Sequence, residues 1–418
     1  MPDLQRENAN LRRILEIARQ MATTTDLDAL LGMIVEAACE VLDCERATIF
    51  LYDPQRDELY SRVARGVEEI RFPADRGIAG QAARQRCCIN VRDAYADCRF
   101  NPEIDRKTGY RTCNLLALPL ENIRGDLIGV LQALNKRGGC FDGADEELAR
   151  ALSAQAGVAL DRGRLLEEYA EKQRMQRDLD IAREIQQGLF PRRNPLIAGY
   201  ELAGWNRPAD ETGGDAYDFV SLDDGRLAVL LADATGHGIG AALVVAQCRA
   251  LLRAMLSVTT DLRVVAARVN RLLSEDLTAN RFVTAFLGVL DPHSHRLEYV
   301  AGGQGPLLMV SPRGVESRPA SELPFAVAPE ISYDPPEQFD FEPGSTLALL
   351  TDGFYEAVNP ADEQFGEARV AAFLRQRGTM PLDRLVAELY AEVQRFTQGR
   401  PQADDLTAVL IRRDSGQR

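Results

Sequence analysis

The sequence predicts an α+β protein in which a long helix joins two domains, and three observations support this. The chain has 418 residues, which at roughly 100–200 residues per domain is too long for one small core. Short β-rich runs alternate with turns over 47–136, and beyond residue 200 such runs outnumber the predicted helices. Between these regions the charge-rich stretch 162–189 contains no proline. Strands joined by hairpin-length turns favour layered α+β domains over a doubly wound parallel sheet.

The composition limits the partners and the compartment. Hydrophobic residues make up 45% and charged residues 27%, and 49 Lys and Arg against 63 Asp and Glu give a net charge of −14. A surface this acidic disfavours nucleic acid and anionic lipid as partners. The longest apolar runs, such as 227–232, fall well short of the roughly 18 residues that span a bilayer, so we expect no membrane segment. Eight cysteines without a CxxC pattern, and a polar N-terminus, predict reduced thiols and a cytoplasmic location.

The first domain begins after an N-terminal helix at 1–25. That helix carries apolar residues at heptad spacing, which fits either a partner-facing seam or a face packed on its own domain. Asp26 and the threonines before it are capping residues for a helix at 27–42. We expect the domain at 26–160, with a final helix from about residue 145 and these strands between: 47–52, 59–64, 115–119 and 127–134.

A helical linker is predicted over 161–190. Its apolar residues follow a loose heptad pattern, which predicts a coiled coil in a homodimer, and a single solvated helix is the alternative. The seam residues are Leu165, Met175, Leu179, Ala182 and Leu189. Pro191 ends this helix, and a second α+β domain follows over 191–418.

Four aspartates in the second domain share one local context, the end of an apolar strand beside small residues. They are Asp215, Asp233, Asp352 and Asp404. Carboxylates that converge at strand ends bind hard cations, and no His/Cys cluster accompanies them, so Mg²⁺ or Mn²⁺ is favoured over zinc. Two such ions would activate a water molecule and hold a phosphoryl group. Taken singly, each aspartate also fits a turn or cap.

Residues 181–413 resemble the metal-dependent phosphatases of the protein phosphatase 2C superfamily, in the bacterial branch of sporulation and stress-response phosphatases. The resemblance rests on Gly213-Gly214-Asp215-Ala216-Tyr217-Asp218, Asp233-Ala234-Thr235-Gly236-His237-Gly238, Thr351-Asp352-Gly353 and Asp404-Asp405-Leu406-Thr407. It implies an αββα β-sandwich and a phosphorylated anti-sigma-factor antagonist as substrate.

The same resemblance implies the metal ligands. Asp233 would bridge two ions, Ala234 would lend its carbonyl oxygen, Asp215 would serve one ion, and Asp352 with Asp404 the other. Asp218 and Asp405 would be structural. His237 is a candidate for protonating the leaving group, and a structural turn residue is the alternative.

Residues 26–160 resemble GAF domains of the cyclic-nucleotide-binding type, through Asn135-Lys136, Phe141 and Asp145-Glu146. The resemblance implies a structural Lys136–Asp145 pair and a bound cAMP or cGMP. Gly77-Ile78-Ala79-Gly80 opens a helix whose free N–H groups favour a phosphate. By position, the candidate ligand contacts are Arg65, Ile78, Ala79, Asn101, Asp105, Thr108, Thr112 and Gln132. A GAF domain that binds another small molecule, or only dimerises, is the alternative.

Together these features predict a cytoplasmic, Mn²⁺- or Mg²⁺-dependent Ser/Thr phosphoprotein phosphatase that an N-terminal GAF domain regulates. One alternative is a non-catalytic scaffold that binds its partner without hydrolysis. A second alternative, a cyclic-nucleotide phosphodiesterase, needs a His/Asp metal site that the three histidines cannot supply.

Overall fold

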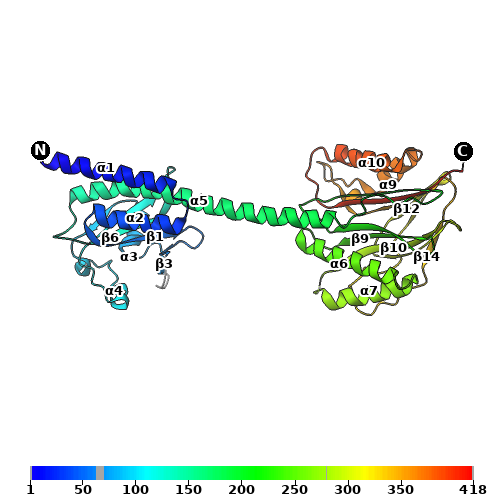
Figure 1. Ribbon diagram of the computed structural model, residues 1–418, viewed down its shortest axis with the longest axis horizontal. Helices are drawn as coiled ribbons and strands as arrows, with labels where there is room; N and C mark the ends of the chain where they lie inside the picture. Colours follow the sequence, from blue (N-terminus) through cyan, green and yellow to red (C-terminus); the bar gives the residue numbers. More distant parts are fainter. Residues whose placement is uncertain (1, 63–69, 279, 417–418) are drawn as a thin grey trace. The chain divides into compact units, whose positions relative to one another are not determined.

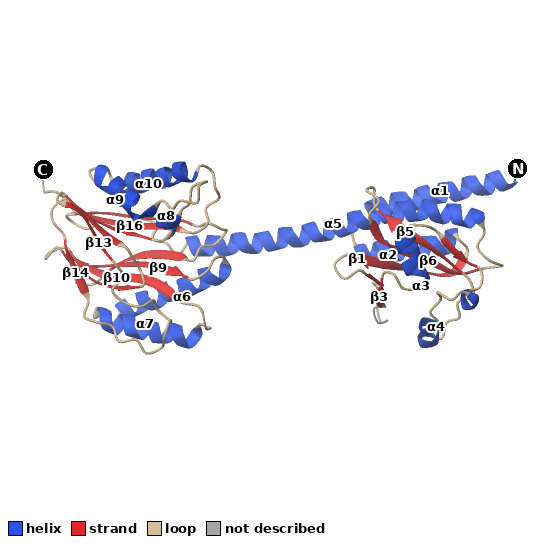
Figure 2. Cartoon of the chain, turned by 180° about the vertical axis from the view of Figure 1, so that it is seen from behind, coloured by secondary structure: helices blue, strands red, loops and turns tan. Residues whose placement is uncertain are grey.

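The computed structural model describes residues 2–62, 70–278 and 280–416 (Figures 1 and 2). The chain divides into two compact units, Met1–Arg174 and Met175–Arg418. The boundary falls within one continuous helix, α5 (Gly143–Gln187), where the sequence predicts a domain helix that runs on into the linker. Both units combine helices with antiparallel sheets, so the predicted α+β class is confirmed.

The first unit contains one six-stranded antiparallel sheet in the order β3-β2-β1-β6-β5-β4. Ile49 and Leu51 of β1 pack on one face with α1, α2 and the beginning of α5, and Phe50 packs on the other face with α3. This alternation follows from the two-residue period of a strand. The elements are α1 (Pro2–Thr23), α2 (Leu27–Val41), β1 (Cys44–Asp53), β2 (Glu58–Tyr60), β3 (Arg71–Pro73), α3 (Gly77–Gln85), β4 (Ile89–Val91), η1 (Ala94–Ala96), α4 (Glu103–Thr108), β5 (Leu115–Glu121) and β6 (Leu127–Lys136).

Local contacts explain how the helices of this unit are held. Asp26 caps α2 by accepting the N–H of Ala29 at 2.7 Å, as its position in the sequence predicts. Ile17 and Met21 of α1 are buried against α2, so the N-terminal helix packs on its own domain. A Cβ on Gly157 would lie 2.2 Å from the carbonyl oxygen of Glu121, so glycine lets α5 approach the end of β5.

The second unit is a sandwich of two five-stranded antiparallel sheets, in the orders β14-β11-β10-β9-β8 and β13-β12-β15-β16-β7. Leu227, Val229 and Leu231 of β9 face the second sheet, and the alternate residues face the outer helices. The α6–α7 pair covers one sheet and α8–α10 cover the other, so the predicted αββα sandwich is confirmed.

The first sheet of the sandwich and its helices are β8 (Asp215–Ser221), β9 (Leu227–Ala234), α6 (Ile239–Leu256), α7 (Leu262–Asp276), β10 (Val283–Asp291), β11 (Arg296–Gly302) and β14 (Glu337–Asp340). The second sheet and its helices are β7 (Tyr200–Arg207), β12 (Leu307–Ser311), β13 (Gly314–Arg318), β15 (Thr346–Leu350), α8 (Gly353–Glu356), α9 (Gly366–Gln376), α10 (Leu382–Thr397) and β16 (Leu406–Arg413).

The helix α6 is long and apolar enough, by length and composition alone, to cross a membrane, and its mean hydropathy is 1.6. It is the single described helix that meets this test. The uninterrupted apolar runs of the sequence did not indicate it, because Gln247 and Arg249 divide them. In the structure Val245, Cys248 and Leu252 are buried in the core beneath β8–β11, as in the core helix of a folded domain.

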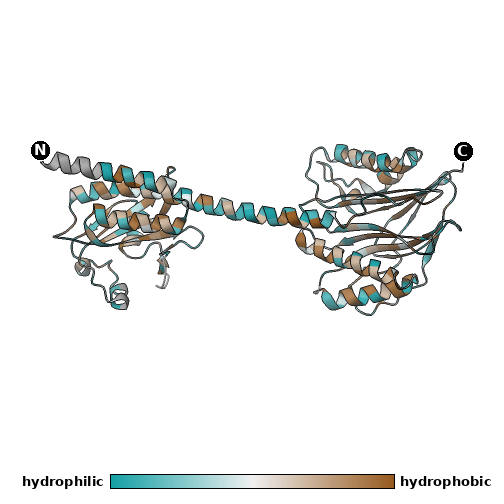
Figure 3. Cartoon of the chain, in the orientation of Figure 1, coloured by the Kyte–Doolittle hydropathy of each residue, from teal (hydrophilic) through white to brown (hydrophobic). Residues whose placement is uncertain are grey.

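The middle of α5 carries few side-chain contacts within the chain. Leu165, Met175, Ile181 and Ile185 are more than half exposed, and Figure 3 shows hydrophobic residues spread along this otherwise largely hydrophilic stretch. The structure describes one chain, so the predicted coiled coil and homodimer stay predictions. The helix ends at Gln187, before Gly188 and Pro191.

Candidate functional site

The predicted acidic site lies at one end of the β-sandwich. Asp215, the first residue of β8, pairs with Asp233 in β9, so the two carboxylates stand side by side on neighbouring strands. Asp352 directly follows Thr351 at the end of β15, and Asp404 lies two residues before the start of β16. The N–H of Thr351 donates to the carbonyl oxygen of Thr407 at 3.0 Å, which ties these two segments together.

Asp215 is the most deeply buried of the four, with 1% of its surface exposed. Its Oδ2 accepts hydrogen bonds from the hydroxyls of Thr351 at 2.8 Å and Thr407 at 2.6 Å, both from the opposite sheet. Burial, followed by the charges of Asp233 and Asp405, raises the pKa of Asp215 well above its usual range. The two threonine hydroxyls therefore stabilise the ionised form of Asp215, which burial and the neighbouring charges disfavour.

The other carboxylates repel one another. Burial and the charges of Asp352, Asp404 and Asp405 raise the pKa of Asp233 to about 8. Burial and the charge of Asp404 raise the pKa of Asp352 to about 6. Asp233 is half-buried, whereas Asp352 and Asp404 are exposed, so the cluster opens to solvent.

This donor set fits a hard divalent cation, because carboxylate oxygens are its preferred ligands and its charge would relieve the repulsion. Within the described part of the chain, no three His, Cys, Asp or Glu side chains lie close enough to hold one metal ion. The carboxylates would have to draw closer together to share an ion.

The neighbouring motif residues have structural partners. Asp405 accepts the N–H groups of Ala209 at 2.7 Å and Gly214 at 2.5 Å, and a Cβ on Gly213 would lie 2.6 Å from its Oδ2. A Cβ on Gly214 would lie 2.8 Å from the carbonyl oxygen of Ala234. The paired glycines therefore let the chain before β8 approach both Asp405 and the predicted carbonyl ligand.

Asp218 is buried and bridges β8 to α6. It forms ion pairs with Arg249 at 2.8 Å and Arg253 at 2.6 Å. The carboxylate of Asp218 thus stabilises the packing of α6 on the sheet.

Two further contacts at this end of the sandwich join residues that lie 27 positions apart in the sequence. His237 is 85% exposed, and its Nδ1 lies 3.1 Å from Oδ2 of Asp210. Gln186, in the last turn of α5, forms two hydrogen bonds with Gly213: its Nε2 donates to the carbonyl oxygen at 2.5 Å and its Oε1 accepts the N–H at 3.0 Å. The end of α5 is thereby attached to the loop that positions Asp215.

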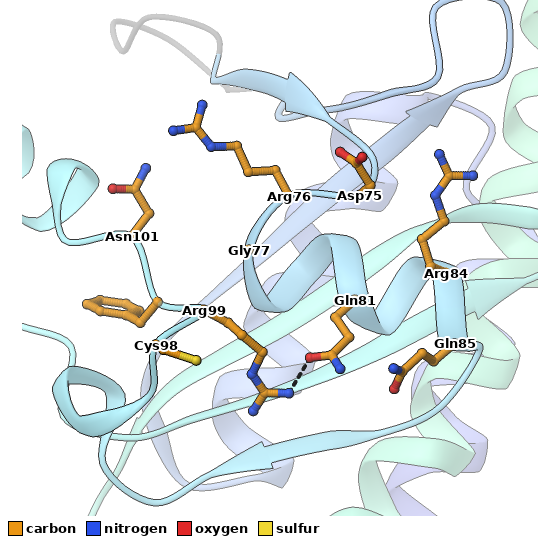
Figure 4. A pocket seen from close by; sticks show the side chains of 10 residues that line it. Asp75, Arg76, Gly77, Gln81, Arg84, Gln85, Cys98, Arg99 and Asn101 are labelled. Carbon is orange, nitrogen blue, oxygen red and sulfur yellow. Dashed lines mark hydrogen bonds between the residues drawn. The ribbon is translucent and has the colours of Figure 1, made fainter.

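In the first unit, a cavity of about 630 Å³ lies beside α3 (Figure 4). Its lining includes Arg76 and Gly77 at the N-terminus of α3, together with Arg99 and Asn101 from the loop before α4. The guanidinium of Arg99 contacts Gln81 and is ion-paired with Asp97. The mixture of cationic, amide and backbone N–H groups suits an anionic ligand.

The eight predicted ligand contacts do not all lie in this cavity. Asn101 lines it, whereas Ile78 and Ala79 are buried in the core just after Gly77. Asp105 accepts both the N–H and the hydroxyl of Thr112, at 2.7 and 2.9 Å, so these two side chains are bound to each other. Gln132 is half-buried in β6 and is not part of the lining. Arg65 and the side chain of Thr108 lie outside the described residues.

The predicted Lys136–Asp145 pair is confirmed, with Nζ 2.7 Å from Oδ1. Lys136 also donates to the carbonyl oxygen of Leu42 at 2.9 Å. The pair therefore fixes the end of β6 to the first turn of α5 and to the end of α2.

Comparison with known families decides what the two units are. The family model of the GAF domain matches residues 26–160, and that of stage II sporulation protein E (SpoIIE) matches residues 223–414. The chain joins a GAF domain to a SpoIIE-type phosphatase domain. Three of the four aspartates, Asp233, Asp352 and Asp404, lie inside the second match, and Asp215 precedes it.

The chain is also similar to individual proteins over part of its length. The chain is 32% identical over 196 residues to the probable 3′,5′-cyclic phosphodiesterase pde-5 of Caenorhabditis elegans, a match covering 43% of this chain and 26% of that protein. It is 36% identical over 190 residues to the cGMP-specific 3′,5′-cyclic phosphodiesterase of Drosophila sechellia, covering 41% and 16%. The chain thus spans about a quarter or less of these relatives.

Among solved structures, the SiaA-PP2C domain of Pseudomonas aeruginosa superposes with a TM-score of 0.53 at 22% identity, covering 59% of this chain and 98% of that one. At this identity the match establishes the fold of the phosphatase domain.

Proposed function

We propose that this protein is a metal-dependent Ser/Thr phosphoprotein phosphatase whose GAF domain regulates it. The observation that carries the proposal is the carboxylate cluster at one end of the sandwich, where Asp215, Asp233 and Asp352 all have raised pKa values through burial and mutual repulsion. Structural carboxylates are ordinarily paired with cations or hydrogen-bond donors, whereas these gather against one another.

In this proposal two Mn²⁺ or Mg²⁺ ions would be held by Asp233, by Asp215 with the carbonyl oxygen of Ala234, and by Asp352 with Asp404. Such a pair of ions lowers the pKa of bound water and neutralises phosphoryl charge. Thr351 and Thr407 orient Asp215, and Asp405 holds Gly214 in place. The exposed carboxylates of Asp352 and Asp404 leave the site open to a phosphorylated side chain on a protein surface.

The proposed substrate is a phosphorylated anti-sigma-factor antagonist in a bacterial cytoplasm. The SpoIIE-type match supports this choice of substrate class. The acidic surface and the free cysteines are consistent with the compartment.

The proposed regulatory ligand is cAMP or cGMP bound to the GAF domain. The Lys136–Asp145 pair, the cavity at the N-terminus of α3 and the similarity to cyclic-nucleotide phosphodiesterases support it. Two copies associated through α5 would carry the signal, since α5 begins in the GAF domain and its last turn places Gln186 beside Gly213.

Turnover of p-nitrophenyl phosphate and of phosphopeptides with Mn²⁺, with and without each nucleotide, tests both parts. We expect metal-dependent turnover that one nucleotide changes. Turnover that ignores both nucleotides would refute the cyclic-nucleotide proposal and leave the phosphatase. The absence of turnover with metal bound would favour the non-catalytic scaffold.

The variant Asp233→Asn distinguishes the phosphatase from the scaffold. Loss of an outer-shell partner of a metal lowers affinity or activity by about 10–100-fold, so loss of the bridging carboxylate should lower turnover by more than about 100-fold. Asp224→Asn, on an exposed turn, is the control and should leave turnover unchanged. A scaffold would keep its biological effect in both variants.

A further inference from the structure

A second, smaller cavity lies directly beside the carboxylate cluster. Its volume is about 140 Å³, and it lies between α8, the C-terminal half of α10 and the loop before β16. Val393 and Thr397 of α10 and Leu406 of β16 are its buried residues. Asp404 is part of its wall, and Gly353, which directly follows Asp352, is another part. The cavity therefore adjoins the proposed phosphatase site at Asp404.

Three of the polar side chains that line this cavity, Thr397, Arg400 and Gln402, form hydrogen bonds within the protein. Arg400 donates to Asp362 at 2.7 Å, and Gln402 donates to the carbonyl oxygens of Arg207 at 3.0 Å and Asp404 at 2.8 Å. The hydroxyl of Thr397 donates to a backbone carbonyl at 3.2 Å. None of the buried unpartnered side-chain atoms found in the described chain belongs to its lining. A side chain that enters the cavity would contact apolar side chains and polar side chains that already have hydrogen-bond partners. An apolar side chain therefore suits the cavity.

The volume of the cavity and the charges on its wall limit further which side chains it can bind. An apolar cavity of about 150 Å³ accommodates a molecule the size of benzene, so a Val, Leu, Ile or Met side chain fits and an indole ring does not. Glu356 and Asp404 line the cavity and disfavour an acidic side chain.

We propose that this cavity binds an aliphatic side chain of the phosphoprotein substrate, close in sequence to the phosphorylated Ser or Thr. The proposal rests on the proposed phosphatase function and adds a specificity determinant to it. Burial of the aliphatic side chain would position the phosphoryl group over the carboxylate cluster and select among phosphoproteins.

The test uses the full chain with Mn²⁺ and phosphoserine peptides in which a single Leu moves through the positions on either side of the phosphoserine in an alanine background. We expect Leu at one position to raise kcat/KM about tenfold over Ala, the discrimination that a small apolar contact provides. Asp at the same position should give no increase. Equal kcat/KM for every Leu position would overturn the proposal.

A pair of matched variants tests whether the preference for Leu depends on this cavity. Ala357→Phe fills the cavity from its half-buried edge and should abolish the Leu preference, while turnover of p-nitrophenyl phosphate stays within about twofold of the wild type, because that substrate has no flanking residues. Ala361→Phe, on an exposed turn outside the lining, should keep the preference. A Leu preference that survives Ala357→Phe would refute the assignment to this cavity.

A third variant covers the case in which Ala357→Phe folds poorly. Val393→Ala enlarges the cavity and should shift the preferred residue from Leu toward Trp, whose indole ring the wild-type cavity excludes. An unchanged preference would again contradict the proposal. A wild-type chain without p-nitrophenyl phosphate turnover would overturn the phosphatase itself, and the role of the cavity with it.

Discussion

At the scale of single residues, the site concentrates negative charge where the fold provides little to neutralise it. Asp215 and Asp233 lie opposite each other on the paired strands β8 and β9. Among the described residues, the side-chain donors to the carboxylate of Asp215 are two threonine hydroxyls. Asp218, on the same strand as Asp215, forms ion pairs with two arginines of α6, and these ion pairs hold α6 on the sheet. The contrast separates a carboxylate that stabilises packing from the carboxylates that we propose as metal ligands.

This charge makes the stability of the metal-free protein depend on pH. The folded pKa of Asp233 is raised to about 8 and that of Asp352 to about 6, whereas unfolded Asp titrates near about 3.9. The folded state therefore holds more protons than the unfolded state between those values, and stability falls as pH rises through this window. Thermal unfolding of the metal-free chain should give a Tm several degrees lower at pH 8 than at pH 5.5.

Two controls accompany that measurement. Asp233→Asn removes one of the repelling charges and should flatten the decrease, and Mn²⁺ should raise the Tm of the wild type more at pH 8 than at pH 5.5. A Tm that rises steadily from pH 5.5 to pH 8 without metal would contradict the proposed repulsion.

The residue scale also marks the limit of what sequence reasoning provides. The aspartates were identifiable because each ends an apolar strand beside small residues. Asp105 and Thr112 carry the right chemistry for a ligand, yet in the structure they satisfy each other across the end of α4. Gln186 and Asp210 act through partners that only the tertiary fold brings near, so no local pattern distinguishes Gln186 from its neighbour Gln187.

At the scale of elements, α5 is the component that we propose to connect ligand binding to chemistry. Its first turn is fixed by the Lys136–Asp145 pair, and its last turn by the two hydrogen bonds between Gln186 and Gly213. Gly213 lies two residues before Asp215, so a displacement of the helix end moves the backbone that carries a proposed metal ligand. Coupling of this kind needs two states that bind metal with different affinity.

Gln186→Ala tests the C-terminal contact. Each hydrogen bond contributes about 0.5–1.5 kcal/mol, so loss of both should release the Gly213 loop and raise the Mn²⁺ concentration for half-maximal turnover several-fold. Gln187→Ala is the matched control, because Gln187 is exposed and makes no described hydrogen bond with this loop. Equal metal dependence of the two variants would show that the contact does not support the site.

The elements themselves were largely predictable. Strands that are apolar along nearly their whole length, such as β9, face two cores at once, and such a run is visible in the sequence. The apolar character of α6 along its whole length was less visible, because Gln247 and Arg249 interrupt its apolar runs. Arg249 is accommodated only because Asp218 lies opposite it on β8, and such compensation depends on tertiary contacts that no window of sequence contains.

At the scale of the whole molecule, the exposed apolar residues of α5 raise the question of what covers them. Leu165 and Met175 are 56% and 62% exposed, and both belong to the predicted heptad seam. Burial of such a seam against a second copy is the ordinary source of coiled-coil stability. We therefore expect the full chain to be a homodimer in solution, and the double variant Leu165→Glu/Met175→Glu to dissociate it, because four introduced carboxylates would face one another in the seam.

Sedimentation velocity over a range of protein concentrations measures this directly. The matched control is Leu166→Glu/Gln176→Glu, which places the same charges one residue later along the helix and outside the seam. We expect the seam variant to raise the dimer dissociation constant more than about tenfold, equivalent to about 1.4 kcal/mol, and the control to leave it nearly unchanged. If the seam variant stays dimeric, another surface holds the two copies together. If dissociation also leaves nucleotide-dependent turnover intact, then the signal passes within one chain through Gln186 and needs no second copy.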